Sequence, residues 1–168
     1  MSASSLQVKN KSKVETPSDR EVRVTRAFNA PAQLVWDAHT KPELMKRWLL
    51  GPDGWSMIVC DIDLRAGGKY HWRWRDDSDG AEFGFTGEYL ELVPITRIVA
   101  TQLMEGMPPP AARNTLVFTQ EGNKTILTVT MDFGSKEARD GAVASGMTDG
   151  METSYQRFER LFIDTKAN

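Results

Sequence analysis

The carboxy-terminal part of the chain, residues 135–166, carries apolar side chains at helical spacing. At about 100° per residue, steps of three and four keep these side chains within an arc of roughly 120°, the width of a stripe that faces a core. We therefore predict an amphipathic helix whose opposite side is solvated. The core-facing stripe consists of Val143, Met147, Met151, Ser154, Tyr155, Phe158, Leu161 and Phe162, and the solvated side of Glu152, Gln156, Arg160 and Asp164.

Capping and glycine signals divide this helical region. Ser135 is suited to the N-cap position, because its hydroxyl can accept a hydrogen bond from the first helical turn. Gly141, Gly146 and Gly150 each cost about 1 kcal/mol relative to alanine inside a helix. We expect a short first helix, a break near Ser145 and Gly146, and a longer second helix.

Earlier in the chain the hydrophobic period changes to two, which is typical of strands. Two short helices follow the first strand, where Pro31 and Pro42 suit the first turn of a helix. The strand that begins at Trp55 is expected to place Ile58, Cys60, Ile62 and Leu64 on one face. The other predicted strands cover residues 21–29, 69–75, 82–93, 97–105, 114–120 and 125–133.

This order of elements predicts an α+β fold. Consecutive strands joined by short loops favour an antiparallel sheet, here of about six or seven strands wrapped around the C-terminal helix. Residues 21–166 are expected to form a single domain, because 168 residues suffice for one core and are few for two. Residues 1–20 contain too little apolar surface to order themselves, so we predict a disordered tail.

The composition argues against several classes of partner. A net charge of −2 gives no overall attraction to nucleic acid or to an anionic membrane, and three lysines in the first 20 residues are a weak basis for a nucleic-acid arm. No apolar run reaches the roughly 18 residues of a membrane span, and the start lacks the apolar region of a signal peptide. The single cysteine, Cys60, cannot form an internal disulfide, which favours a reducing compartment. We expect a cytoplasmic protein, either monomer or dimer.

Four stretches of the chain resemble one known family. They read AFNAPAQLVWDAHTKPELMKRWLLGPDGW, DLRAGGKYHWRWRD, FTGEYLELVPITRIV and GMTDGMETSYQRFERL. In this order they resemble the AHSA-type domain, named after the activator of heat-shock-protein ATPase, within the START-like (SRPBCC) superfamily. The resemblance covers about residues 21–164. It implies a helix-grip fold, in which a curved antiparallel sheet holds the C-terminal helix and leaves a cavity between them.

The resemblance also implies a range of functions. Superfamily members bind lipids, sterols, hormones or polyketides in the cavity, some are cyclases, and the co-chaperone branch binds a chaperone in the stress response. No catalytic residues carry over from the single-domain relatives. The co-chaperone has an additional amino-terminal domain, where this chain has a short polar segment, which argues against chaperone activation.

Aromatic and methionine side chains are the main candidates for a ligand site. Apolar cavities with a few polar groups are the usual form of small-molecule sites, and methionine adapts to varied ligands. The alternative for each residue is that it packs in the core. The predicted cavity-lining residues are Tyr70, Trp72, Trp74, Phe83, Phe85, Met104, Met131, Phe133, Met147, Met151 and Tyr155.

Polar groups in the same region suggest a second hypothesis for the site. His71 and Arg73 share one side of the strand 69–75, and Glu88 lies on the next strand. If that side is concave, His71 could orient a ligand or move a proton near neutral pH. We expect the opposite side, with the aromatic residues, to face inward, although a single β-bulge would invert this assignment.

Neither a metal nor a cofactor is expected. His39, His71 and Cys60 do not stand at metal-site spacing, and the Asp-rich segment 76–80 lacks the glutamate spacing of a calcium-binding EF-hand loop. Nucleotide-binding glycine motifs do not occur.

Three functions follow as hypotheses. The first is binding of a small hydrophobic or aromatic molecule, such as a lipid, a sterol or a polyketide-like compound, between sheet and helix. The second is a protein-interaction module that modulates a chaperone or another enzyme. The third is an enzyme of cyclase or hydrolase type that uses His71, Arg73 or Glu88.

Overall fold

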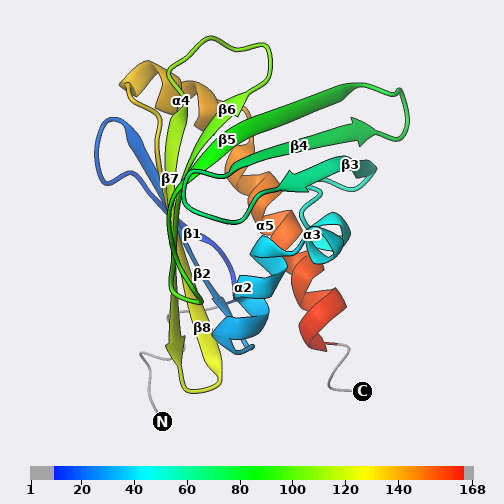
Figure 1. Ribbon diagram of the computed structural model, residues 1–168, viewed down its shortest axis with the longest axis vertical. Coiled ribbons are helices and arrows are strands. Elements are labelled where there is room, and N and C mark those ends of the chain that lie inside the picture. Colours follow the sequence, from blue (N-terminus) through cyan, green and yellow to red (C-terminus); the bar gives the residue numbers. More distant parts are fainter. Residues whose placement is uncertain (1–9, 165–168) are drawn as a thin grey trace.

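The computed structural model describes residues 10–164. One eight-stranded antiparallel sheet, in the order β1-β2-β8-β7-β6-β5-β4-β3, curves around the C-terminal helices (Figure 1). The α+β prediction is confirmed. The strands are β1 (Lys13–Glu15), β2 (Glu21–Phe28), β3 (Trp55–Ile62), β4 (Lys69–Asp76), β5 (Glu82–Val93), β6 (Arg97–Met104), β7 (Ala112–Glu121) and β8 (Lys124–Asp132).

Two short helices, α2 (Ala32–Thr40) and α3 (Pro42–Trp48), follow β2 as predicted. Pro42 occupies the first turn of α3, where its missing N–H has no consequence. Trp48 is buried at the end of α3, and its indole donates a hydrogen bond to the Ala38 carbonyl at 2.8 Å. This hydrogen bond connects α3 to α2. The two helices lie beside the C-terminal helix at the lower end of the curved sheet (Figure 1).

The C-terminal region is divided as the glycines predicted. Helix α4 (Lys136–Ala144) begins at Ser135, whose hydroxyl accepts a hydrogen bond from the Ala138 N–H at 3.1 Å. Gly146, in the left-handed conformation with φ 84°, separates α4 from α5 (Met147–Phe158). A π-helical turn, η1 (Glu159–Ile163), which we did not predict, continues α5. None of the helices in residues 10–164 is long and apolar enough to cross a membrane.

The prediction that residues 1–20 are disordered was partly wrong. Residues 1–9 lie outside the described residues, but Lys13–Glu15 forms β1 and pairs with β2. The Ser12 N–H also donates a hydrogen bond to Glu152 on α5 at 2.8 Å. Backbone pairing and one side chain on a distant helix order this polar segment, and neither can be inferred from its own apolar content.

A β-bulge corrects the expected face of β3. The register between β3 and β4 shifts between Met57 and Val59. Met57 and Cys60 are therefore buried, while Ile58 is 36% exposed. The extra residue moves Ile58 off the inner face, because one inserted residue inverts the alternation on one side of the bulge.

The core lies between the inner face of the sheet and the helices. Phe28 on β2 contacts both Tyr155 and Phe158 edge to face, with ring centroids 5.3 and 5.2 Å apart. Trp48 stacks on Tyr155 at 5.9 Å. A second, smaller cluster under α3 contains Met45, Met57, Cys60 and Trp74. These contacts fill the space beneath the second half of α5.

Candidate functional site

The aromatic side of β4 faces inward, as predicted. Tyr70 and Trp74 are 4% and 6% exposed. The Tyr70 hydroxyl donates to the Thr101 carbonyl at 2.5 Å, and the Trp74 indole donates to the Leu49 carbonyl at 2.7 Å. Both side chains are thus fixed at their polar ends as well as packed.

Four of the eleven predicted lining residues belong to the packed core. Each is less than 9% exposed, and Tyr155 is enclosed by Phe28 and Trp48. Burial raises the pKa of Tyr70 and of Tyr155, so both hydroxyls stay protonated at neutral pH. These four side chains are packed and support the inner surface. The four are Tyr70, Trp74, Met131 and Tyr155.

The other predicted lining residues are only partly buried. Trp72 lies opposite Phe85 on β5, and Phe85 lies opposite Met104 on β6, so the three form a row across neighbouring strands. Met104 is 41% exposed. Partly buried apolar side chains along one inner surface distinguish this upper region from the packed lower core. The remaining members are Phe83, Phe133, Met147 and Met151.

The inner face of the same region also carries two polar side chains that we did not predict, Asn114 on β7 and Gln102 on β6. Asn114 on β7 lies opposite Ala100 and Met131, which are both buried in the core, and directly opposed residues share a face. Its Nδ2 donates to Gln102 Oε1 at 3.0 Å. Alternation with Leu116 and Phe118 in the sequence was a usable signal for an inward Asn114.

Two buried polar atoms in this region have no hydrogen-bond partner among the described residues. They are the indole Nε1 of Trp72 and the Oδ1 of Asn114. A buried polar atom without a partner costs about 1–3 kcal/mol, and native proteins contain few of them. Both atoms are covered by other protein atoms, so these two unpaired groups reduce the stability of the packed inner face.

His71, Arg73 and Glu88 do not form the polar group that we considered for catalysis. In register they lie opposite Thr86, Gly84 and Lys69, on the outer face of the sheet. His71 and Arg73 instead contact Glu105, at 3.1 and 2.8 Å. Hydrogen bonds from His71 and Arg73 lower the pKa of Glu105. The outer-face cluster is an ion-pair network centred on Glu105.

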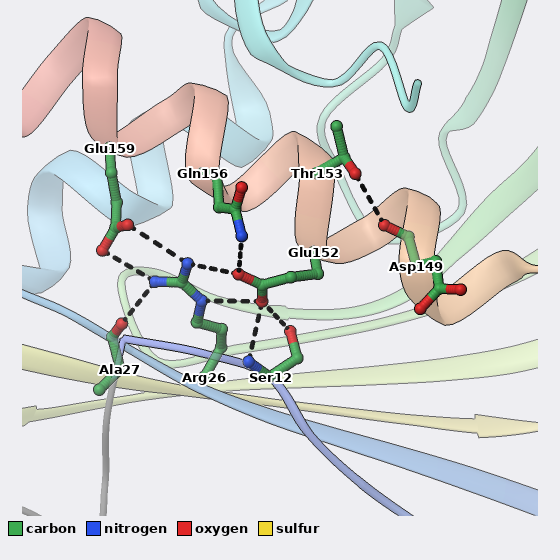
Figure 2. A network of polar contacts seen from close by, with 8 residues as sticks. All are labelled: Ser12, Arg26, Ala27, Asp149, Glu152, Thr153, Gln156 and Glu159. Carbon is green, nitrogen blue, oxygen red and sulfur yellow. Dashed lines mark hydrogen bonds and ion pairs between the residues drawn. The ribbon is translucent and has the colours of Figure 1, made fainter. Parts of the chain in front are cut away.

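A buried arginine fixes α5 against the sheet (Figure 2). Arg26 on β2 is 1% exposed and lies between two carboxylates of the helix. Its Nη2 is 2.9 Å from Glu152 and its Nη1 is 2.8 Å from Glu159. Ser12 adds a hydroxyl hydrogen bond to Glu152 at 2.5 Å. We expected Glu152 on a solvated side, but it contacts the sheet because α5 lies in the curve of the sheet.

The pKa values of this network follow from its contacts. Burial alone would raise the pKa of Glu152, but hydrogen bonds from Arg26, Ser12 and Gln156 lower it to about 2. Burial alone would lower the pKa of Arg26, but the hydrogen bonds to Glu152 and Glu159 outweigh this effect and raise it. The pair therefore stays charged across the physiological range, with a structural role.

A second arginine ties α5 to the segment after α3. Arg157 is 8% exposed and donates to the carbonyls of Trp48 and Gly51 at 3.1 and 2.9 Å. It also contacts Asp53 at 2.9 Å, and the Gly51 N–H donates to the Ser154 hydroxyl at 2.8 Å. The second half of α5 is thus anchored on two sides, whereas its first half carries the partly exposed Met147 and Met151.

The nitrogen and sulfur side chains considered as metal ligands lie in separate places. His39 on α2 packs against Trp48 and Phe118, and burial lowers its pKa to about 4. Cys60 is buried beside Met45, and burial raises its pKa to about 11. Within residues 10–164 no three His, Cys, Asp or Glu side chains gather in a way that could hold a metal ion.

Solved structures share this fold over most of their length. A protein from Rhodobacter sphaeroides is 26% identical, with a TM-score of 0.84 over 90% of this chain and 97% of that chain. A protein from Chromobacterium violaceum is 26% identical, with a TM-score of 0.70 over 84% and 96%. An AHSA1-like protein from Aeromonas hydrophila shares the fold at 18% identity, with a TM-score of 0.66 over 82% and 92%.

Comparison of the sequence with curated proteins and with family profiles shows which family the chain belongs to. No curated protein sequence matches the chain. The sequence profile of the family described as "Activator of Hsp90 ATPase homolog 1-like protein" matches residues 29–162, from the end of β2 to the π-helical turn. This chain therefore belongs to the Activator of Hsp90 ATPase homolog 1-like family, within the START-like (SRPBCC) superfamily.

Proposed function

We propose that this protein binds a small, mainly apolar molecule on the inner face of the sheet, between strands β4–β7 and the first half of α5. The observation that supports this most is the row of apolar side chains across β4, β5 and β6 that are not fully buried, formed by Trp72, Phe85 and Met104. A ligand that buried this apolar surface would gain free energy because the surface is removed from water.

The same geometry limits where the ligand can bind. Phe28, Trp48, Tyr155 and Phe158 are already packed together beneath the second half of α5. The proposed site is therefore restricted to the upper region around Trp72, with Met147 and Met151 opposite the sheet.

A direct test uses native mass spectrometry and thermal shift with fatty acids, sterols and aromatic polyketides. We expect at least one class to be retained and to raise the melting temperature. In Met104→Glu, a charge introduced at a partly exposed position of the inner face should abolish retention. Thr119→Glu is the matched control, because Thr119 is exposed on the outer face of β7, next to the inward Phe118, and it should bind like the wild type. Absence of retention and of stabilisation across the panel contradicts the proposal.

A second candidate function is a protein-interaction module, as in the co-chaperone branch of the family. It is favoured by Met104 and Met107, which are 41% and 58% exposed at and just after the end of β6. The test is the ATPase rate of a purified Hsp90-type chaperone with and without this protein. Stimulation that Met107→Ser removes would support a co-chaperone role, whereas an unchanged rate would contradict it.

A further inference from the structure

Helix α4 and its cap lie between two glycines in the left-handed conformation. Gly134 and Gly146 both have φ 84°. Among the described residues, a Cβ atom built on Gly146 would meet nothing within 4 Å, and one built on Gly134 would meet only Pro110 Cγ, at 3.9 Å. Hinges are a few residues at the ends of elements that absorb large changes in φ and ψ, which glycine does with the least strain. Both ends of α4 therefore have the freedom that a hinge needs.

The same helix has few contacts with the rest of the protein. None of its residues is buried, and Val143, which we predicted on the core-facing stripe, is 40% exposed. Within residues 10–164, one side-chain hydrogen bond connects α4 to a distant part of the chain, from Arg139 to the Ser18 carbonyl at 2.9 Å. Displacing α4 would expose little apolar surface and break one polar contact, so it belongs to the low-cost local motions of a folded protein.

Helix α4 lies at one end of the inner face. Its bond to Ser18 places it at the start of β2, where Val22 is fully buried opposite Met131 on β8. Phe133 and Met147, which lie just outside the two glycines, are partly buried apolar side chains of the upper region. The helix thus connects the end of β8 to the start of α5 at the upper end of the sheet (Figure 1).

We propose that α4 is a lid, hinged at Gly134 and Gly146 and held closed by Arg139, and that its displacement admits the ligand to the upper region. This inference rests on the proposed function, because it specifies how the same site opens. Ser18 lies between β1 and β2, and the pairing of β1 with β2 holds this segment on the sheet. The amino-terminal segment therefore supplies the acceptor that keeps the lid closed.

Thiol labelling with N-ethylmaleimide measures the displacement without any ligand. The reporter is the thiol introduced by Met131→Cys, and the internal control is the native Cys60, which is 7% exposed in the separate cluster under α3. Arg139→Ala removes the bond to Ser18. We expect it to raise the labelling rate of the reporter about threefold to tenfold, the effect of one lost hydrogen bond, and to leave the rate of Cys60 unchanged.

Lys136→Ala is the matched control in the same helix. It removes an exposed ion pair to Asp140 within α4 and leaves the bond from Arg139 in place, so it should change neither labelling rate. Melting temperatures establish that each variant is folded. A reporter rate that Arg139→Ala leaves unchanged, or that rises together with the rate of Cys60, overturns the inference, because no local opening is then controlled by this bond.

Stopped-flow fluorescence with N-phenyl-1-naphthylamine, a neutral apolar probe, tests whether the lid admits a ligand. Its association rate should rise in Arg139→Ala by about the same factor as the labelling rate and should stay unchanged in Lys136→Ala. An association rate that stays constant while labelling accelerates overturns the lid as the entrance and leaves the binding function in place. Absence of binding by this probe, together with absence of retention across the wider panel, overturns both.

Discussion

At the scale of single residues, Arg26 shows how one charged side chain determines a contact between distant elements. On β2 it alternates with Val22, Val24 and Phe28 and is therefore directed into the core. Burying its charge would be prohibitive without Glu152 and Glu159. The arginine therefore restricts α5 to the one position in which both glutamates reach the sheet.

The first prediction concerns this arginine. Arg26→Met keeps much of the side-chain volume but leaves two partly buried glutamates without their counter-charge, so we expect a loss of about 3 kcal/mol in the free energy of unfolding. Arg23→Met is the control, because Arg23 lies on the same strand and faces away from the core, with one hydrogen bond to Thr130 at 3.2 Å. Equal effects of the two substitutions in urea titrations would contradict the assigned role.

The second prediction is a loss of stability in acid that begins with His39. The folded protein lowers the pKa of His39 from 6.5 to about 4, so the unfolded chain binds more protons between these values. Stability should be complete above about pH 6.5 and should fall by on the order of 1–3 kcal/mol as the pH approaches about 4. Glu152, with its pKa lowered from 4.5 to about 2, should add a further loss below about pH 4.5.

Urea midpoints measured across this pH range check the assignment. His39→Gln removes the titrating ring, so its midpoint should vary less than that of the wild type above about pH 4.5 and should still decline below it. A wild-type midpoint that stays constant from about pH 7 to about pH 4.5 would show that His39 is not held neutral by the fold.

At the scale of elements, α4 and α5 differ although they are neighbours in sequence. Helix α4 has no buried residue, whereas α5 has Ser154, Tyr155, Arg157 and Phe158 buried. Most helical stability comes from packing of an apolar face, so α4 depends on its cap and on exposed polar contacts. Gly146, at φ 84°, joins the two helices in a conformation that suits glycine best.

The third prediction follows from this difference. Backbone amides of α4 should exchange hydrogen for deuterium at least about tenfold faster than those in the second half of α5. Hydrogen-exchange mass spectrometry resolves the two helices as separate peptides. Similar protection in both would mean that α4 is held by more than its cap and the bond from Arg139 to Ser18. Ligands that bind the proposed site should also slow exchange in the first half of α5.

At the scale of the whole molecule, β1 connects the amino-terminal segment to both the sheet and the long helix. It pairs with β2 through Lys13, Val14 and Glu15, and Ser12 contacts Glu152. A short edge strand of this kind also covers the backbone groups that β2 would otherwise present at the edge of the sheet.

The fourth prediction tests this connection by deletion. Removing residues 1–16 should lower the free energy of unfolding by about 1–2 kcal/mol, because two hydrogen bonds to Glu152 and the β1–β2 pairing are lost. Removing residues 1–9 alone is the control and should have a much smaller effect. Equal stability of the two deletion variants would contradict a structural role for β1.

Much of the fold could be predicted because its signals are local. The bounds of β5 and the division between α4 and α5 follow from alternation, Ser135 and Gly146 within single segments. Ile58 was misplaced because a bulge depends on pairing with β4, which the β3 segment does not encode by itself. Asn114 was missed although it alternates with Leu116 and Phe118, and its bond to Gln102 could not be foreseen because it depends on the pairing of β6 with β7.

The sequence by itself determined the periods of the elements and their order, since each depends on neighbouring residues in the chain. It favoured an inward direction of Tyr70, Trp72 and Trp74, and the pairing of β4 with its neighbours decided it. Only the tertiary structure decided which inward residues are packed and which stay partly exposed, and that Trp72 and Asn114 keep an unpaired polar atom. The physical reason is distance along the chain. Burial and hydrogen bonding at these positions depend on residues from other strands and from α5, such as Glu152, which lies 126 positions from Arg26.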